Sequence, residues 1–399
     1  LLYRAREKNL AGYGQLNLGN DVIDATLGVR ISRVKTRVTP PNPTGVPAID
    51  DGSKRTSILP NASVRYRVSD EVQLRAAASK TRTLPNFADL NPNYTLSPPL
   101  GGGTVGTPSD PYRANGGNPF LRPFTSWNFD AAAEFYFGRS SFVSVTGFHR
   151  SIKGFIQQDT FDIDDPTLGT IRLTGPVNTG KGRITGVEVQ GQAFADFDWL
   201  PDWARGFGAQ ANVTYIDAKT QQPDPAGGLS YQPITDQLNG VSKWNYNLVG
   251  IYERDGLAAR LTYNGRSSFR ALQALRGDDV YTEVAHPAGR LDLSLNYDVT
   301  DNFTLFGDWT NITRKTFRQD FTSARNGAPE AEFLRYRRYD ESTISLGLRF
   351  RFNGPGPRAA EPVAAPLPPP PPPPPPVEAV PETPPPPPPP PPPPAPERG

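Results

Sequence analysis

The sequence has no cysteine, no methionine and only two histidines, His149 and His286, among its 399 residues. The absence of cysteine excludes a disulfide framework and any thiolate site. The histidines lack the His-x-x-x-His and His-x-Glu spacings of common metal sites, and neither has a recognisable nucleophile as its partner. We therefore predict a protein that is not an enzyme and that holds neither a cofactor nor a metal.

Long apolar runs are absent as well. No stretch approaches the roughly 18 consecutive apolar residues of a membrane-spanning helix, and hydrophobic residues make up only 36% of the chain. If the protein crosses a membrane, it must do so with strands. The formal net charge of +2 comes without a block of basic residues, so we expect no nucleic-acid partner.

The sequence does contain alternation with a period of two residues. From Ile344 to Phe352, large apolar side chains occupy every even position, and Ser, Gly or Arg lies between them. Because successive side chains of a strand point to opposite faces, this segment has one apolar and one charged face. Such a strand fits a soluble sandwich, or a membrane barrel whose apolar face meets lipid and whose polar face lines a wet lumen.

Similar segments recur along the chain, joined alternately by short turns and long connections. Segments of about ten residues are long enough for tilted strands to cross a bilayer, and aromatic side chains gather near their ends, as in interfacial girdles. A large soluble sandwich or propeller is the alternative, but no blade-length repeat is present. We predict an all-β fold, a transmembrane antiparallel β-barrel, with about thirteen strands at residues 10–18, 22–38, 57–67, 72–81, 128–137, 142–155, 183–194, 207–217, 241–253, 257–264, 290–299, 303–312 and 342–352.

Several of these stretches resemble the barrel of TonB-dependent outer-membrane receptors. They are residues 58–66 (ILPNASVRY), 74–81 (LRAAASKT), 117–123 (GNPFLRP), 127–130 (WNFD) and 134–137 (EFYF). The ending Gly347-x-x-Phe350-x-Phe352 resembles the signal read by the outer-membrane assembly machinery, although Leu346 stands where that signal usually has a polar residue. The combination looks most like the branch common in Caulobacter and Xanthomonas relatives, often linked to carbohydrate uptake.

The resemblance implies a 22-stranded barrel around an N-terminal plug, of which residues 1–353 would form the C-terminal strands. The chain also opens within a strand-like pattern, without methionine or signal peptide, so we expect a fragment that lacks the plug and the motif that binds TonB. The implied function is TonB-coupled uptake of a solute, a carbohydrate or a siderophore, across the outer membrane of a Gram-negative cell. Two alternatives stay open: a passive porin, and a structural envelope protein that the barrel anchors.

Ligand contacts are expected from aromatic and polar side chains of the long outer connections. These candidates are Tyr94, Tyr112, Asn115, Tyr231, Asp236, Arg266, Phe269, Arg270, Phe317 and Arg318. The last connection, Arg314 to Asp340, carries seven Lys or Arg against four Asp or Glu. That excess could steer an anionic solute or face the phosphates of lipopolysaccharide, and the sequence favours neither. The expected partners are thus outer-membrane lipid and lipopolysaccharide, a small solute, TonB and the assembly machinery.

Residues 354–399 form a separate proline-rich segment, with unbroken proline at Pro368–Pro376 and Pro384–Pro394. Proline cannot donate to a sheet and this composition cannot bury a core, so we predict a disordered polyproline II tail. At about 3.1 Å per residue the extended tail would span on the order of 140 Å. Because it follows the terminal strand, it is expected in the periplasm.

We expect the length of this tail to matter more than its sequence. Replacing Pro368–Pro376 with glycine and serine converts a stiff extended segment into a coil, whose span grows only as the square root of its length. Crosslinks from Glu397 to peptidoglycan or inner-membrane proteins should then decrease, while barrel insertion is unchanged. Loss of crosslinking on substitution of Glu378, Glu382 or Thr383 at constant length would instead identify a specific proline-motif ligand.

Overall fold

The computed structural model describes residues 3–39, 49–138, 140–178, 180–195, 197–221, 236–276, 279–325 and 331–352. The proline-rich segment lies outside these residues, so its predicted conformation stays a prediction. Within the described part of the chain, no helix is long and apolar enough to span a membrane.

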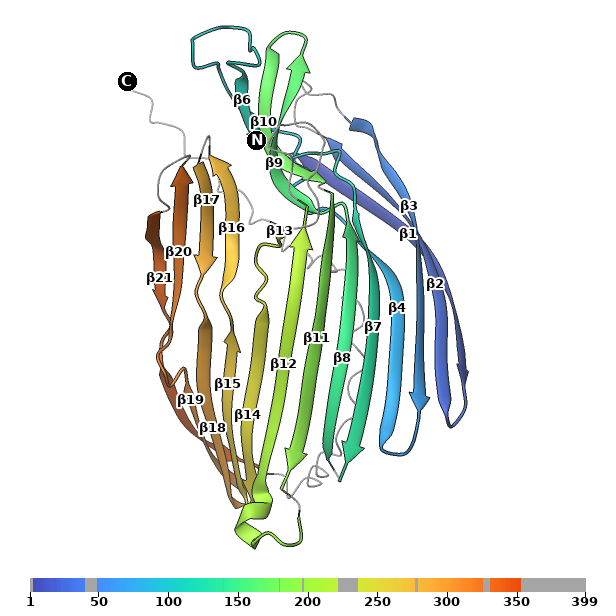
Figure 1. The fold of residues 1–399 in the computed structure, drawn as a ribbon, viewed down its shortest axis with the longest axis vertical. Coiled ribbons are helices and arrows are strands. Elements are labelled where there is room, and N and C mark those ends of the chain that lie inside the picture. Colours follow the sequence, from blue (N-terminus) through green and yellow to red (C-terminus); the bar gives the residue numbers. More distant parts are fainter. Residues whose placement is uncertain are drawn as a thin grey trace, which may run out of the picture. The chain divides into compact units, whose positions relative to one another are not determined.

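One large antiparallel sheet contains all the strands that the sequence predicts (Figure 1). Its path runs through thirteen strands in chain order, so each main strand lies beside its predecessor, and this confirms the predicted number. The strands are β1 (Arg4–Gly19), β2 (Ile23–Thr39), β3 (Ile49–Arg67), β4 (Val72–Thr83), β7 (Phe124–Phe137), β8 (Ser141–Lys153), β11 (Lys181–Phe194), β12 (Phe207–Thr220), β14 (Trp244–Arg254), β15 (Leu257–Arg266), β18 (Ala288–Thr300), β19 (Phe303–Thr310) and β22 (Thr343–Phe350). The two-residue β13 (Asp236–Gln237) pairs with β12, and the short 3₁₀-helix η1 (Asp202–Gly206) precedes β12.

Tight turns join the strands at one end of this sheet. The turn between β14 and β15 consists of Asp255 and Gly256, whose φ angles are 50° and 79°. A two-residue hairpin of type I′ requires positive φ at both positions, and Asp-Gly is one of the pairs that adopt it readily. Such a turn matches the twist of the strands, so it fixes the register of the pair.

The long connections at the other end are not the loops that we predicted. They form two additional four-stranded sheets. The first contains β5 (Tyr94–Ser97), β6 (Tyr112–Gly116), β10 (Gly169–Asn178) and β9 (Ile156–Asp165), and the second contains β16 (Phe269–Arg276), β17 (Asp279–Ala285), β20 (Thr316–Arg325) and β21 (Ala331–Tyr339). The loop prediction was wrong because the alternating runs in these segments are short, as in Ile171-Arg172-Leu173-Thr174, which Gly175 and Pro176 follow. Their pairing also joins distant parts of the chain, as in the parallel contact of Ile171 with Tyr112.

The two faces of the main sheet differ in polarity. On β22 the apolar side chains are freely exposed, with 82% of Leu346 and 61% of Leu348 accessible. The opposite face of neighbouring strands carries polar pairs such as Arg260 with Ser294. In the described residues, the buried apolar clusters lie against the small sheets and loops, as in the contact of Val38 with Leu90 and Leu121. No second layer covers the apolar face in this part of the chain, so the soluble sandwich is not the observed fold.

Aromatic side chains gather where the tight turns lie. Phe303 stacks on Phe350 with 4.6 Å between ring centroids, and Phe207 packs edge-on against Tyr252 at 4.8 Å. These positions correspond to the girdle expected at one boundary of an apolar band.

Gly347 on the terminal strand lies directly beside the aromatic ring of its partner on the neighbouring strand, Phe306. A Cβ placed there would overlap the ring of Phe306 on β19, so the glycine lets this ring lie across β22. We expect Gly347→Val to destabilise the β19–β22 pair by about 1–3 kcal/mol, a typical cost of overpacking. The measurement is the fraction of heat-modifiable, folded protein in the outer membrane.

Gly147 on β8 provides the matched control, because a Cβ there would meet nothing within 4 Å. Gly147→Val should insert at the wild-type level. Equal folded fractions for the two variants would show that the close approach at Gly347 has no role in assembly.

Candidate solute-binding site

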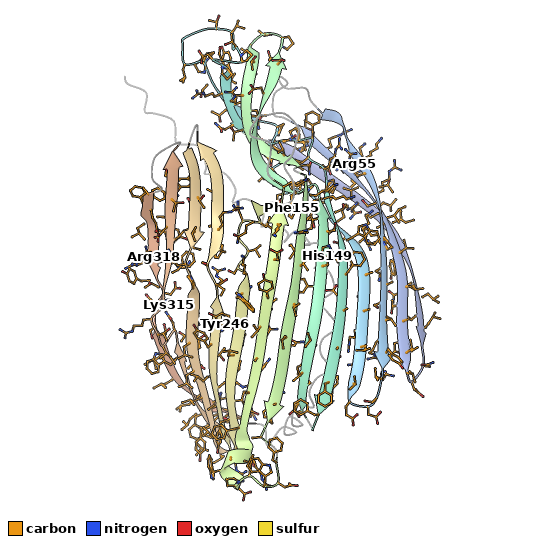
Figure 2. All side chains as sticks on the ribbon, viewed as in Figure 1. Arg55, His149, Phe155, Tyr246, Lys315 and Arg318 are labelled. Atoms are coloured by element: carbon orange, nitrogen blue, oxygen red, sulfur yellow. The ribbon has the colours of Figure 1, made fainter. Side chains whose placement is uncertain are left out.

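An open cavity of about 430 Å³ lies on the polar face of the main sheet, beside the middle of β12 and the ends of β14, β15 and β18 that are remote from the tight turns. Most of its lining residues have polar side chains, and the segment that leads into β20 and the end of β21 border it. The lining residues are Asn212, Asn245, Tyr246, Asn247, Asn264, Gly265, Arg266, Ala288, Gly289, Arg290, Asn311, Lys315, Thr316, Phe317, Arg338 and Asp340. Figure 2 labels Tyr246 and Lys315 among them.

The floor of the cavity is a row of amide side chains that runs across neighbouring strands. Asn212 on β12 is the register partner of Asn247 on β14, and Asn247 is in turn opposite Asn264 on β15. The row ends at Arg290 on β18. Asn247 donates from Nδ2 to Oδ1 of Asn264 at 2.5 Å. Since each amide has both donors and an acceptor, the row can offer either to a bound polar solute.

The cavity also holds more positive than negative charge. Arg290 pairs with Asp292 at 2.7 Å, and Arg338 pairs with Asp340 at 2.8 Å. Arg266 instead stacks over the ring of Phe269, 4.5 Å from its centroid. Among the described residues, neither Arg266 nor Lys315 forms an ion pair. These two cations are therefore the charges that a solute anion could neutralise.

Asn311 holds Lys315 at the cavity. Asn311 is 2% exposed, and its backbone adopts a φ of 52°. Its backbone N–H donates to Oδ1 of Asp292 at 2.7 Å, and its own Oδ1 accepts the N–H of Lys315 at 3.2 Å. Asp292 thus ties Arg290 and Asn311 together, which fixes two sides of the cavity.

Only some of the ligand contacts predicted from the sequence lie at the cavity. Arg266 and Phe317 line the cavity, and Phe269 lies beside it under Arg266. Arg270 donates to Oδ1 of Asn239 at 2.7 Å and to the carbonyl of Gln237.

The remaining predicted residues lie away from the cavity or beyond what the structure describes. Tyr112 donates to the carbonyl of Thr104 at 3.0 Å, and Asn115 is exposed on β6. Tyr94 lies on β5 and Asp236 on β13, without a described side chain, and Tyr231 lies outside the described residues. Arg318 belongs to a separate cluster on the second small sheet.

Sequence reasoning missed most of the cavity. Asn245, Asn247, Asn264, Arg290, Lys315 and Arg338 were not among the predicted contacts. Asn245, Asn247 and Asn264 lie on the polar face of strands, whereas the predicted contacts all belong to the long connections. These asparagines could have been found from the alternation itself, because the polar residues near the ends of those strands face the same side as the cavity.

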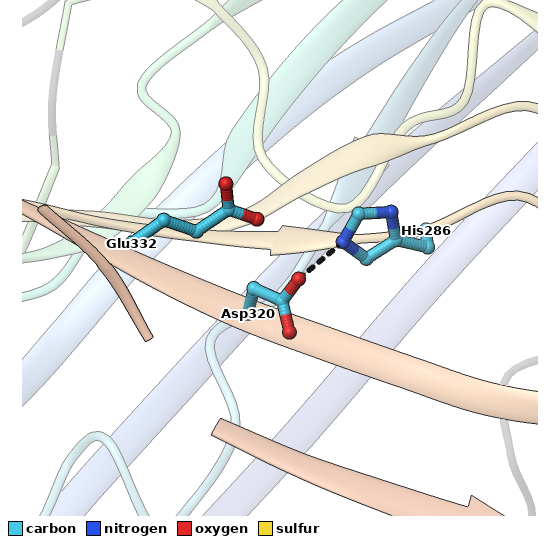
Figure 3. A group of neighbouring side chains, drawn as sticks. All are labelled: His286, Asp320 and Glu332. Atoms are coloured by element: carbon cyan, nitrogen blue, oxygen red, sulfur yellow. Dashed lines mark hydrogen bonds and ion pairs between the residues drawn. The ribbon is translucent and has the colours of Figure 1, made fainter. Parts of the chain in front are cut away.

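The cluster of His286, Asp320 and Glu332 is the other concentration of ionisable groups (Figure 3). His286 Nε2 lies 2.6 Å from Oδ2 of Asp320, and Arg318 donates from Nε to Oδ1 of the same carboxylate at 3.0 Å. Three ligand atoms of the cluster lie within 4.8 Å of one another, which would suit a cation. Both oxygens of Asp320 are already engaged, however, so a metal would have to displace Arg318 or His286.

We interpret this cluster as a structural tie between β20 and the end of β17. The hydrogen bond from Arg318 lowers the pKa of Asp320 to about 2; burial opposes that shift, and His286 adds to it. The pKa of Asp320 in the folded state is therefore lower than its usual value of 3.8. The ionised carboxylate stabilises the sheet fully at pH values above 3.8, and this stabilisation is lost as the pH falls through about 2.

Asp320→Asn should therefore weaken the second small sheet in a pH-dependent way. The measurement is the hydrogen-exchange protection of β17 and β20 amides, corrected for intrinsic rates. Protection should be lower in the variant at pH 6, and the difference should shrink as the pH is lowered from 4 to 2. A difference that stays constant over this range would assign the effect to packing instead of charge.

The comparisons with known proteins agree with this architecture. The sequence model described as "TonB dependent receptor-like, beta-barrel" matches residues 2–312. No curated protein sequence matches the chain.

Similar folds occur among solved structures. The ferric enterobactin receptor PfeA of Pseudomonas aeruginosa, in complex with BCV-L6, aligns with a TM-score of 0.54 at 15% identity, over 86% of this chain and 54% of that one. The siderophore receptor PiuA of Acinetobacter baumannii gives 0.53 at 14% identity, over 87% and 44%. The copper transporter OprC gives 0.53 at 16% identity, over 78% and 43%.

The chain spans about half the length of these structures. At such identities the likeness concerns the fold alone, while the family model covers most of the sequence. The chain therefore belongs to the TonB-dependent receptor-like β-barrel family.

Proposed function

We propose that the chain is part of an outer-membrane receptor that takes up a negatively charged polar solute with energy from TonB. The observation that carries the proposal is the cavity on the polar face, where Arg266 and Lys315 have no anionic partner among the described residues. A transporter fits these features better than an enzyme, because the cavity's donors and cations bind but include no base placed beside a nucleophile.

The solute class follows from the charge of the cavity. A ferric siderophore complex that carries negative charge would satisfy both cations and the amide row. Two of the similar structures are described as a ferric enterobactin receptor and a siderophore receptor, which supports this class. The row of asparagines gives a second candidate, a neutral carbohydrate, because amides bind sugar hydroxyls without needing a charge.

The membrane placement is part of the same proposal. The exposed apolar face of the main sheet would meet lipid, and the tight turns would face the periplasm, with the two small sheets outside the cell. Residues 354–399 would then form a periplasmic tail. TonB would act through an N-terminal region that precedes these strands, and the assembly machinery would recognise Gly347, Phe350 and Phe352 on or just after the terminal strand.

The proposal is tested by the affinity of the full-length receptor for anionic and neutral solutes. Arg266→Gln combined with Lys315→Gln removes both unpaired cations, and each charge-assisted hydrogen bond contributes about 1.5–3 kcal/mol. We expect the Kd for an anionic ferric siderophore to rise by about a hundredfold or more. Arg122→Gln, an exposed cation outside the cavity, should leave it unchanged. An unchanged Kd for the siderophore and tight binding of a neutral oligosaccharide would favour the carbohydrate.

Energy coupling separates this proposal from its alternatives. Uptake by cells that express the receptor should cease when TonB is deleted. Uptake that continues would identify a passive porin. An envelope defect with normal solute uptake in a strain without the protein would instead indicate a structural anchor.

A further inference from the structure

A second cavity, of about 450 Å³, lies on the polar face of the main sheet. We call it the amide cavity, and we call the candidate solute site, which holds Arg266 and Lys315, the cationic cavity. The amide cavity is lined by Phe142, Gln190, Gly191, Gln210, Ala211, Asn212, Asn247 and Val249, none of which carries a charge. Asn212 and Asn247 line both cavities. The two cavities are therefore adjoining parts of one polar surface.

The row of amide side chains under the cationic cavity continues into the amide cavity. Gln190 on β11 is the register partner of Asn212 on β12, and Ser144 on β8 is opposite Gln190. Glu134 on β7 is in turn opposite Ser144. Since directly opposed residues share a face of the sheet, these side chains prolong the row that begins at Arg290 on β18. The row therefore extends from β18 to β7, and all its members are polar.

This row comes closer to the tight turns as it crosses the sheet. Arg290 lies ten residues before Thr300, where β18 ends at its tight turn. Glu134 lies only three residues before Phe137, where β7 ends at its own. The change corresponds to on the order of 20 Å along a strand, a slope that the stagger of neighbouring strands in a barrel produces. The amide cavity thus occupies a part of the row that is nearer the tight turns than the cationic cavity is.

The two glutamines of the amide cavity have unused hydrogen-bonding groups. Within the part of the chain that the structure describes, the side chains of Gln190 and Gln210 form no hydrogen bond. Asn212, by contrast, donates from Nδ2 to the carboxylate of Glu188. A side-chain amide carries both N–H donors and an acceptor carbonyl. Gln190 and Gln210 can therefore offer both kinds of group to a molecule in the cavity.

Elsewhere on the polar face, side chains of opposite charge neutralise one another. Arg67 pairs with Asp24 at 3.2 Å, Arg75 with Glu134 at 3.0 Å and Arg150 with Asp130 at 2.7 Å. All of these residues lie on β2, β3, β4, β7 and β8, to one side of the amide cavity. A paired charge gains little free energy from a ligand, whereas an amide without a partner gains hydrogen bonds. The glutamines of β11 and β12 are therefore the part of this face that is open to a ligand.

We propose that the amide cavity is a second solute site, which holds the uncharged, hydrogen-bonding part of the solute after the solute leaves Arg266 and Lys315. The amides match hydroxyl, carbonyl or amide groups, and the ring of Phe142 adds an apolar surface beside them. Passage through a pore requires sites that bind strongly enough for entry but weakly enough for release. A site without charged lining residues meets the second requirement. The proposal rests on the proposed function, because the solute must first enter the cationic cavity.

The first test titrates the full-length receptor, in an uncharged detergent, with maltose, a neutral hydroxyl-rich probe. Gln190→Leu combined with Gln210→Leu, the leucine variant, removes the free amides at similar side-chain volume. Since each glutamine contributes a neutral hydrogen bond, we expect the Kd for maltose to rise by about fivefold to a hundredfold. Gln190→Asn combined with Gln210→Asn keeps the amides and should bind maltose nearly as the wild type does.

Two further variants show whether this effect belongs to the amide cavity. Arg266→Gln combined with Lys315→Gln should leave the Kd for maltose unchanged, because neither residue lines the amide cavity. Ser294→Leu combined with Asn296→Leu removes polar groups from the same face outside both cavities, and it should also leave this Kd unchanged. An equal loss of maltose binding in the second control would assign the effect to the apolar substitutions in general and would overturn the proposal.

The second test measures TonB-driven uptake of ferric enterobactin, an anionic probe, in cells. The leucine variant keeps both cations, so its Kd for this probe should equal that of the wild type, while its uptake rate should fall by about fivefold or more. An unchanged uptake rate would show that the solute does not use the amide cavity. A wild-type receptor that binds no ferric enterobactin contradicts the solute class proposed above, and the maltose titration then decides on the amide cavity by itself.

The melting temperature of the receptor without solute separates binding from a structural role. The glutamines have no partner among the described residues, so the leucine variant should melt at the wild-type temperature. A lower melting temperature with an unchanged Kd for maltose would assign the glutamines to contacts with the region that precedes β1 and would overturn the proposal. Absence of maltose binding by the wild type, or equal Kd values for the wild type and the leucine variant, would refute a second solute site.

Discussion

The alternation of side chains along a strand is the constraint on which the rest of the structure depends. A strand that crosses an apolar phase must satisfy its backbone through its neighbours, so consecutive hairpins build one continuous antiparallel sheet. Period two then assigns one face of that sheet to lipid and the other to water. Every functional feature described above lies on one of these two faces or beyond the ends of the strands.

This constraint explains where cations are placed. On the polar face, Arg290 is held by Asp292, and the amide row continues from it across β15, β14 and β12. On the outer face, Lys8, Lys35 and Lys54 stand where an uninterrupted apolar surface ends. The same strand geometry thus provides a solvated site inside and a charged boundary outside.

Period-two patterns were enough to predict the main sheet from the sequence. Ile344, Leu346 and Leu348 alternate with small or charged residues, and such a pattern determines both strand and face. The small sheets were missed because the alternating runs in their strands are only a few residues long, as in Ile171-Arg172-Leu173-Thr174. The parallel pairing of β6 with β10 also joins residues about sixty positions apart, as Tyr112 and Ile171 do, and no local pattern contains that information.

The cavity could be predicted only in part, because its residues come together through strand register and not through a local sequence pattern. Arg266 and Phe317 are predictable from composition alone, because they are a polar and an aromatic residue of the outer connections. Asn212, Asn247 and Asn264 become neighbours only through the registers of two successive hairpins. A single asparagine on a polar strand face is unremarkable, and only the three-strand row makes it a binding surface.

Charge compensation separates structural clusters from binding sites in this protein. Asp320 is 1% exposed, and both of its oxygens accept hydrogen bonds from Arg318 and His286. A carboxylate whose oxygens are already hydrogen-bonded gains little free energy from a ligand, so the role of this cluster is to stabilise the second small sheet. Arg266 and Lys315 have a cavity beside them and no carboxylate partner among the described residues. A cation without a carboxylate partner is the arrangement that an external anion stabilises.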